Sequence, residues 1–488
     1  MKPGGGSPAA GDEAVRGPVP RWGHRRGREA GVTERGRAVV APLALAQFIA
    51  SYAATTMTVS ISAIAADLGT TVAGVQTTIT LFTLTMAALM VPGSRLTDVL
   101  GRKACFVGGL VVYGAGALLA ALAPGPWLMT LGYSVLEGVG SALMIPPIYI
   151  LVTVLFDDLA ARARNFGVVS AAGGLGAAAG PLIGGLVTSG VGWRASFLLQ
   201  VAVVVVVLVW SRRVTDPVPR GPRPRFDVRG AVLSAAGLAL VVIGVLGTGA
   251  HGWSSWRVWS SVGLGVVVLW CFSRHVRACE RAGRDPLCPS RVFRDLGSNL
   301  GLVTQLVQWL VLQGAFFVVS VYLQQVRGLD AIGTGLVLLP ATAGVLLAAA
   351  VAERAARGHP QRRLIRIGFA ATVAGVALLL ALVRKDTTLL SFVPGLLVLG
   401  AGLGTMLTAS VTLVQSAWPP DAQGAISGVS RSASNLGASL GTALAGSVVA
   451  GSADGRTFAA ALAVLGGVAV AGFGVALLLP RRSGAQPS

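Results

Sequence analysis

Charged residues are scarce in this sequence. Aspartate, glutamate, lysine and arginine make up only 12% of its 488 residues, whereas 53% are hydrophobic. A soluble domain carries about 25% charged residues, so this composition excludes an ordinary soluble protein. Lysine is almost absent: it accounts for three of the 39 basic residues, a skew typical of a GC-rich bacterial coding bias.

The residue types that carry most enzyme chemistry are also few. The histidines are well separated, in predicted tails or loops: His24, His251, His275 and His359. The cysteines show no metal-ligand spacing and are expected to be reduced: Cys105, Cys271, Cys279 and Cys288. Neither a Ser/His/Asp arrangement nor an ATP-binding domain is recognisable. The chain is therefore not expected to be an enzyme, and no cofactor or metal is expected.

The net charge of +20 is distributed in short basic clusters between apolar segments. This distribution argues against nucleic-acid binding, which favours a continuous basic face. Residues 1–37 are rich in glycine, proline and arginine and have no apolar face. We expect them to form a disordered basic cytoplasmic tail.

Apolar runs of about 20 residues, the length that crosses a bilayer as a helix, recur from residue 38 to residue 480. We count fourteen spans, at 40–66, 75–96, 104–123, 127–153, 165–188, 194–211, 228–248, 257–274, 298–324, 331–352, 363–383, 388–415, 424–450 and 456–480. The sequence thus predicts an all-α polytopic membrane protein.

The basic residues set the predicted orientation. With the amino terminus inside, the inner segments hold 32 of the 39 basic residues and the outer segments hold six, while Arg431 lies within a span. Because cytoplasmic loops carry the excess of lysine and arginine, both termini are expected in the cytoplasm. The expected location is the bacterial cytoplasmic membrane.

Two connections are longer than the others, the Pro/Arg-rich linker 215–230 and the basic stretch 274–297. They bracket two spans that are almost free of polar residues, so we expect two homologous six-helix halves with a lipid-facing insertion. The predicted units are a tail (1–37), an N-terminal bundle (38–211), a linker with two extra helices (212–297), a C-terminal bundle (298–480) and a cytoplasmic tail (481–488).

Two motifs stand out. In "GGLGAAAGPLIGG" (173–185), Gly176, Gly180 and Gly184 recur every four residues, which gives one smooth helix face for close packing, and Pro181 favours a kink. The thirteenth span repeats the spacing at Gly437 and Gly441.

The second motif, "SRLTDVLGRKA" (94–104), is a short inner connection. The residues of interest in it are Asp98, Gly101, Arg102 and Lys103. We expect a tight turn in which the carboxylate caps a helix and the cations reach a neighbouring carboxylate, Asp157 or Asp158. These residues are the candidates for inner-loop gating.

Together with "VYLQQVRGLDAIGTGLVLLPA" (321–341) and "GAISGVSRSASNLGASLGTALAG" (424–446), these motifs resemble the major facilitator superfamily, specifically its 14-span drug:proton antiporter branch. The 94–104 connection looks like that superfamily's loop signature, and 176–185 looks like the antiporter motif of the fifth helix. The resemblance implies two six-helix bundles plus two inserted helices. It also implies a proton-driven exporter of amphipathic small molecules that works by alternating access.

The chain departs from that pattern at charged positions. Ala53 stands where the first span of this branch usually carries an aspartate, and Ser134 where the fourth span usually has an arginine. Glu137 replaces the usual glutamine of that span. Two familiar intramembrane charges are therefore missing, and one new acid has appeared.

Glu137 lies ten residues into its span, so it is expected near the bilayer midplane, where a charge costs roughly 2–3 kcal/mol. An acid that alternates between neutral and charged forms as its access to water changes would couple transport to protons. Two alternatives remain: a neutral group that bonds a neighbouring helix as glutamine would, or a group that recognises a cationic substrate.

Polar stripes on the first and ninth spans are the candidates for the substrate cavity, and interhelical hydrogen bonding is the alternative. The residues are Gln47, Ser51, Thr55, Thr58, Gln305, Trp309, Gln313 and Phe316. Arg431 is either an interfacial arginine that extends to the membrane surface or a partner for an anionic group.

The functional classes that remain as alternatives to an exporter are a same-fold importer, a receptor or scaffold without transport, and a channel. The predicted partners are a small-molecule substrate, protons and lipid, and a monomer is expected.

Overall fold

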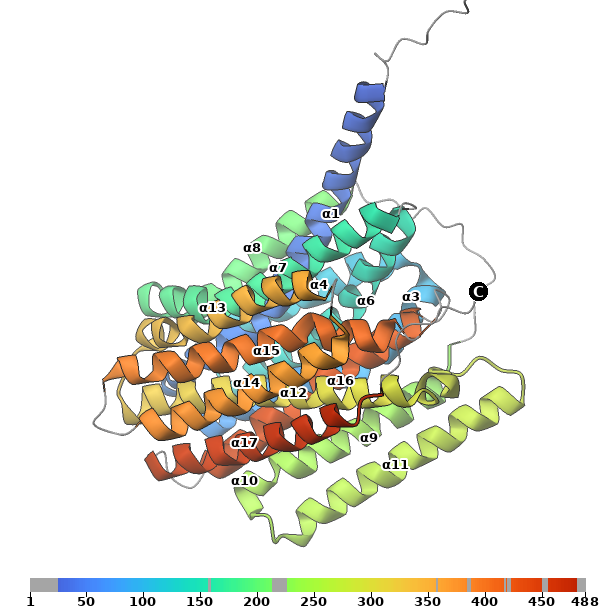
Figure 1. Ribbon diagram of the computed structural model, residues 1–488. Helices are drawn as coiled ribbons and strands as arrows, with labels where there is room; N and C mark the ends of the chain where they lie inside the picture. The colour runs from blue at the N-terminus through green and yellow to red at the C-terminus, as the bar shows by residue number, and fades with distance from the viewer. Residues whose placement is uncertain are drawn as a thin grey trace, which may run out of the picture.

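The computed structural model describes residues 25–156, 159–212, 226–356, 359–383, 388–416, 418, 423–449 and 455–480. Within these ranges it describes side chains from Val39 onward, except at 153, 159–163, 250 and 423–424. Within these ranges the chain is helical and contains no strand (Figure 1). Asp157 lies outside the described residues, so its predicted role stays a prediction.

The N-terminal half comprises α1 (Arg25–Thr56), η2 (Met57–Val59), α2 (Ile61–Asp67), α3 (Val72–Leu100), α4 (Arg102–Ala121), α5 (Pro126–Met129), η3 (Thr130–Glu137), α6 (Gly138–Leu155), α7 (Leu159–Gly190) and α8 (Trp193–Ser211). The insertion comprises α9 (Val228–Leu246), α10 (Thr248–His251), α11 (Trp256–Arg281) and η4 (Ser290–Phe293). The C-terminal half comprises α12 (Leu296–Val321), η5 (Tyr322–Val326), α13 (Ala331–Ala355), α14 (Gln361–Leu382), η6 (Leu389–Ser391), α15 (Phe392–Gln415), α16 (Gln423–Val449) and α17 (Gly455–Leu477). Because α1 begins at Arg25, the predicted domain boundary at residue 38 falls inside a helix.

Thirteen segments in the described ranges are long and apolar enough to cross a membrane. The one predicted span that is missing from this set is the thirteenth in chain order, α16, a helix of 27 residues rich in serine and glycine. It packs between α3 and α12, so its buried hydroxyl groups at Ser430, Ser434 and Ser439 are shielded from lipid. Its low hydropathy therefore follows from its central position.

Helix packing repeats between the halves. The pairs α1–α7, α3–α6 and α4–α8 of the first half correspond to α12–α16, α13–α15 and α14–α17 of the second. The halves meet along two equivalent pairs, α3–α16 and α7–α13. This pairing confirms the predicted architecture of two related six-helix bundles.

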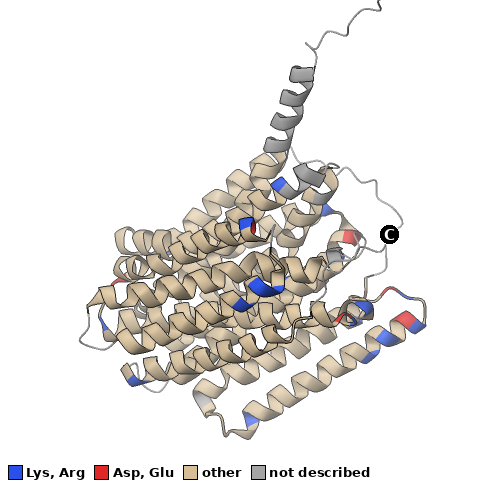
Figure 2. Ribbon diagram, viewed as in Figure 1, with Lys and Arg blue, Asp and Glu red and all other residues tan. Residues whose placement is uncertain are grey.

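The insertion lies on one side of the bundle pair. Helix α9 packs against α3 and α16, and α11 packs on the outer side of α9 (Figure 1). Large apolar side chains of α11, such as Trp259 and Trp270, are more than half exposed, as expected for a lipid-facing helix. Figure 2 shows that most charged residues lie at helix ends and in connections.

We call the side where α1 begins and α17 ends the terminal face, and the opposite side, which carries α2, the far face.

Local sequence explains several helix boundaries. Asp295 and Asp330 cap α12 and α13 by accepting hydrogen bonds from Ser298 N–H (2.6 Å) and Gly333 N–H (2.9 Å). Gly101 has a φ of 96°, a conformation that favours glycine, and it gives the predicted tight turn between α3 and α4.

Candidate functional site

Glu137 closes a π-helical segment, η3, in the middle of the fourth span. Such wide turns are rare and occur often at functional sites. The segment is fixed by hydrogen bonds to two other helices: Ser134 Oγ donates to Thr78 O (2.7 Å) and Tyr133 OH donates to Ala53 O (3.1 Å). Ser134, at the position of the expected arginine, thus donates to a backbone carbonyl of α3. Ala53, at the position of the expected aspartate, accepts through its own backbone carbonyl. Both positions support the π-helical segment.

Helix α4 approaches η3 closely because glycines line the contact. A Cβ atom on Gly116 would lie 2.7 Å from the backbone nitrogen of Glu137, and one on Gly132 would lie 2.7 Å from the nitrogen of Ala120. Neither distance is compatible with a side chain. The glycines therefore enclose Glu137 within the N-terminal half.

Glu137 is fully buried, and neither carboxylate oxygen has a hydrogen-bond partner within the described residues. Tyr113 of α4 is a polar neighbour of Glu137, and the Tyr113 hydroxyl donates to the amide oxygen of Gln200 in α8. Burial of an unpaired carboxyl group disfavours its ionised form. The neighbours lie within the first half, so Glu137 does not face the boundary between the halves.

The polar stripe of α1 faces the glycine face of α7. A Cβ atom on Gly173 would lie 3.1 Å from the Gln47 side chain, and one on Gly180 would overlap the Thr55 hydroxyl. Gln47 Nε2 also donates to Ser51 Oγ (3.2 Å). The predicted cavity residues of α1 and the antiporter motif therefore lie against each other.

The glycine motif is a packing surface in both halves. Substituents on Gly176 and Gly184 would overlap Phe48 O and the Thr56 hydroxyl of α1, and equivalent groups on Gly437 and Gly441 would overlap backbone carbonyls of α12. These distances confirm that the glycine face permits close packing of two helices, as the sequence predicts. A transport role for the motif stays a prediction.

Pro181 belongs to the other side of α7, which faces the second half. A Cβ atom on Gly335 of α13 would lie 2.6 Å from Pro181 O, and one on Gly185 would lie 2.6 Å from Ala331 O. Near the far face, Ser189 Oγ donates to Asp330 Oδ2 (3.2 Å). Helices α7 and α13 are thus in close contact in their far-face halves.

The predicted stripe on α12 forms interhelical hydrogen bonds in this conformation. Gln305 accepts from Ser430 Oγ (2.9 Å) and donates to Ser434 Oγ (2.8 Å), both on α16. Gln313 donates to Ala54 O across the halves (3.0 Å). Trp309 is half-buried and Phe316 is buried.

A second cross-half contact at the far face includes Thr58. Gln324 of η5 donates to Thr58 O (3.3 Å) and Val59 O (3.1 Å), and it accepts from Ser62 N–H (3.0 Å). We call the set Thr58, Val59, Ser62 and Gln324 the far-face contact. Sequence reasoning placed Thr58 in a cavity and missed Gln324, because the pairing depends on how the halves approach.

A polar chain in the terminal-face part of the interior was also missed. Tyr149 OH donates to Gln47 Oε1 (3.3 Å), and the guanidinium of Arg431 donates to the same hydroxyl. The Arg431 Cζ atom lies 4.7 Å from the Tyr149 ring centroid, a cation–π geometry. Arg431 therefore contacts an aromatic residue of the other half, where the sequence suggested an interfacial side chain or a partner for an anion.

Two of the described inner-loop candidates, Asp98 and Lys103, interact with different partners. Asp98 pairs with Arg95 one turn earlier on α3 (3.5 Å), and Lys103 Nζ donates to Arg212 O (3.4 Å). Asp98 does not cap the helix as predicted, because Gly101 is the N-cap of α4 and no side chain bonds there. Among the described residues, the ion-pair partner of Asp98 therefore lies one turn away on the same helix.

These features define a polytopic helical membrane protein of two related halves with a polar, glycine-lined interior. The chain belongs to the Major Facilitator Superfamily, whose family model matches residues 43–442. A crystal structure of the peptide transporter POT in complex with sulfate superposes with a TM-score of 0.64 at 15% identity, over 92% of this chain and 97% of that one. That similarity shows the shared fold.

Curated relatives match this chain over more than two thirds of their own lengths. The puromycin resistance protein pur8 of Streptomyces alboniger is 31% identical over 412 residues, which cover 83% of this chain and 80% of that protein. The probable actinorhodin transporter of Streptomyces coelicolor is 29% identical, with coverage of 81% and 69%. The multidrug efflux pump LfrA of Mycolicibacterium smegmatis is 29% identical, with coverage of 80% and 78%.

Proposed function

We propose that this protein is a proton-coupled exporter that moves amphipathic small molecules, such as drugs or a natural product, out of a bacterial cell. The relatives named above are a resistance protein, a probable transporter and an efflux pump, which supports export. A multi-pass protein of the inner membrane fits this role. We further propose that both termini are cytoplasmic and that the protein is a monomer.

The contacts between the halves support alternating access. With cytoplasmic termini, the far face is extracellular, and there the far-face contact and the Ser189–Asp330 hydrogen bond join the halves. The structure then corresponds to a state that is closed toward the outside. Export requires these few hydrogen bonds to break while the bundles remain intact.

Glu137 carries the proposal of proton coupling, because it is a fully buried acid with no hydrogen-bond partner in the described residues. A neutral acid is the favoured form in this environment. When a conformational change brings water or the phenol of Tyr113 to the carboxyl group, the ionised form gains hydrogen bonds and the proton can leave. The proton therefore binds in one conformation and dissociates in the other.

Tyr113 and Gln200 are proposed to position the proton site. The Tyr113 hydroxyl donates to Gln200 and has Glu137 as a neighbour, so a small rearrangement lets it donate to Glu137 instead. The amide nitrogen of Gln200 and the hydroxyl of Tyr52 have no partner in the described residues. These polar atoms can bind water along a path from Glu137 toward α1 and α8.

A susceptibility screen tests the proposed export. A pump-deficient bacterial host expressing the chain is compared with the same host expressing Glu137→Gln, across diverse amphipathic antibiotics. We expect increased tolerance to at least one compound with the wild type and not with the variant. Increased sensitivity would support import. Unchanged tolerance, with the protein confirmed in the membrane, would count against a drug exporter.

A further inference from the structure

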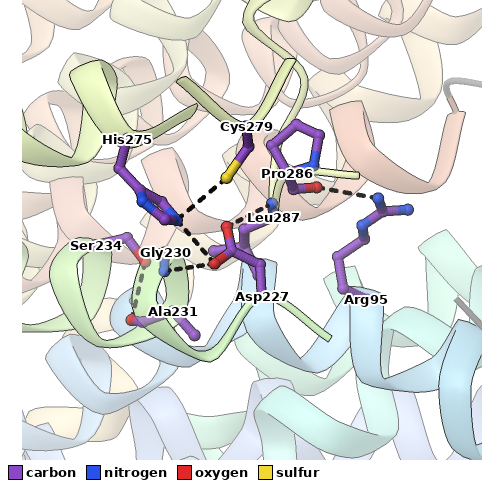
Figure 3. Close-up of polar contacts among 9 residues, drawn as sticks. All are labelled: Arg95, Asp227, Gly230, Ala231, Ser234, His275, Cys279, Pro286 and Leu287. Atoms are coloured by element: carbon purple, nitrogen blue, oxygen red, sulfur yellow. Dashed lines mark hydrogen bonds and ion pairs between the residues drawn. The ribbon is translucent and has the colours of Figure 1, made fainter. Parts of the chain in front are cut away.

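Three residues with metal-ligating side chains meet where the inserted helices reach the terminal face (Figure 3). His275 Nε2 lies 2.9 Å from Asp227 Oδ1 and 3.5 Å from Cys279 Sγ. The ligand atoms of Asp227, His275 and Cys279 all lie within 4.8 Å of one another. Nitrogen, oxygen and sulfur donors thus converge on one point.

The positions of these side chains follow from the two helices. Asp227 is the N-cap of α9, and its carboxylate accepts hydrogen bonds from Gly230 N–H (2.9 Å) and Leu287 N–H (3.1 Å). His275 and Cys279 are four residues apart on α11, so they share one face. The two backbone N–H groups therefore fix the Asp227 carboxylate, and the shared helix face places His275 and Cys279 beside it, before any metal ion binds.

Burial distinguishes the cluster from a solvated surface group. The Asp227 and His275 side chains are only 9% and 20% exposed, and Cys279 is buried. Cys271, two turns earlier on the same helix, is exposed. The three donors therefore face one another between α9 and α11 instead of lipid or water.

We propose that Asp227, His275 and Cys279 bind a zinc ion. Zinc takes thiolate, imidazole and carboxylate ligands at about 2.0–2.3 Å in a tetrahedral arrangement. Ligand atoms separated by 2.9 and 3.5 Å are close to the edges of such a tetrahedron, and a fourth position remains for water. Calcium and magnesium prefer oxygen ligands, so a site with nitrogen and sulfur selects against them.

The bound ion would stabilise the insertion at the place where it contacts α3. It would link α9 to α11, and Leu287 already ties the following segment to Asp227. The adjacent residue, Pro286, accepts a hydrogen bond through its carbonyl from Arg95 Nη2 of α3 (3.0 Å), as Figure 3 shows. The site thus stabilises the packing of the inserted helices beside the last turns of α3.

Cobalt binding to the purified, metal-free full-length protein tests the site. Cobalt(II) substitutes for zinc, and a thiolate ligand gives it a charge-transfer absorption that a carboxylate or imidazole does not. We expect one cobalt per chain with this absorption, displaced by one equivalent of zinc. The readout is independent of transport, so it stands or fails separately from the proposed function.

Conservative variants assign the ligands. Cys279→Ser should abolish the thiolate absorption and weaken zinc binding at least tenfold, because loss of even an outer-shell partner costs about 10–100-fold. His275→Gln keeps a hydrogen-bond donor to Asp227 and should also lose tenfold or more. Asp227→Asn keeps an N-cap residue for α9 and tests the carboxylate.

Cys271→Ser is the matched control on the same helix and should leave binding unchanged. Absence of stoichiometric cobalt or zinc binding by the wild type would overturn the proposal and leave only a hydrogen-bonded Asp227–His275 pair. Binding that survives both Cys279→Ser and His275→Gln would overturn it equally.

Discussion

Gln324 accepts a hydrogen bond from the backbone N–H of Ser62 at 3.0 Å, across the boundary between the two halves. The same amide donates to Thr58 O and Val59 O. One side chain of the second half thus holds three backbone groups of the first. In an alternating-access protein, this contact must exist in one state and be absent in the other.

Gln324→Ala should therefore favour the conformation that is open at the far face. Each lost hydrogen bond contributes about 0.5–1.5 kcal/mol, so the equilibrium should shift about tenfold or more. Spin labels at Thr71→Cys and Thr388→Cys, in a background without the native cysteines, report the far-face distance. Gln325→Ala is the control, because Gln325 makes a single 3.4 Å contact to Ser62. Identical distance distributions for wild type and Gln324→Ala would contradict this account.

Tyr149→Phe should have the opposite effect. The change keeps the ring beneath Arg431 but removes the hydroxyl that joins Gln47 to Arg431 on the terminal-face side. Loss of this bridge should favour opening at the terminal face. Labels at Ala104→Cys and Glu353→Cys should then show longer distances, while the far-face pair stays unchanged or shortens. A longer far-face distance in Tyr149→Phe would contradict the idea that the far-face contact and the Tyr149 hydrogen bonds favour opposite conformations.

Gly176→Ala should destabilise the protein. The new methyl group would overlap Phe48 O on α1, and overpacking of this kind costs about 1–3 kcal/mol. Gly174→Ala is the matched control on the same helix, since its Cβ atom would meet nothing within 4 Å. Thermal unfolding in detergent should give a lower Tm for Gly176→Ala alone. Equal Tm values would mean that the two helices separate at little cost.

The contact between Asp67 and Arg194 should give a pH-dependent stability. Arg194 donates to Asp67, and this interaction holds the pKa of Asp67 below its usual value, assisted by Trp193 Nε1 at 3.1 Å. Because the folded pKa is lowered, the stabilisation is present above the unfolded pKa of about 3.9 and is lost as pH falls through the folded value. Both side chains are at least 40% exposed, so solvent screening limits the effect to at most about 1 kcal/mol.

The measurement is the Tm difference between wild type and Asp67→Asn. It should be positive at neutral pH and should shrink in strong acid. A difference that is the same in both conditions would show that the ionised carboxylate does not contribute.

The fold could be predicted because a bilayer restricts each span to an apolar helix and places basic residues at one face. Even α16, the most polar of the spans, was counted among the apolar runs, and its Gly437 and Gly441 repeat the glycine spacing of the fifth span. Such signals are local. They require no knowledge of which helices pack together.

The partners of polar side chains could not be predicted in the same way. Gln305 pairs with serines of α16 and Gln313 with a carbonyl of α1, and the choice depends on how helices rotate and cross. The Asp227, His275 and Cys279 cluster was missed because cysteine spacing was compared only among cysteines. The four-residue interval between His275 and Cys279 was the available signal.

Glu137→Gln should uncouple substrate transport from the proton gradient. Glutamine keeps the size and hydrogen-bonding capacity of the acid but cannot release a proton. Gradient-driven transport should be lost, while exchange of labelled for unlabelled substrate stays largely intact. Glu353→Gln is the control, because Glu353 is exposed at the end of α13. Gradient-driven transport that persists in Glu137→Gln would assign this residue a structural role.

Transport driven by an imposed pH difference tests the central claim most directly. Purified protein is reconstituted into vesicles with a compound selected by the susceptibility screen, and substrate flux is followed together with an internal pH indicator. The account predicts substrate movement against its gradient, coupled to proton movement in the opposite direction, in wild-type vesicles and not in Glu137→Gln vesicles. Substrate movement that is the same with and without the pH difference would contradict it.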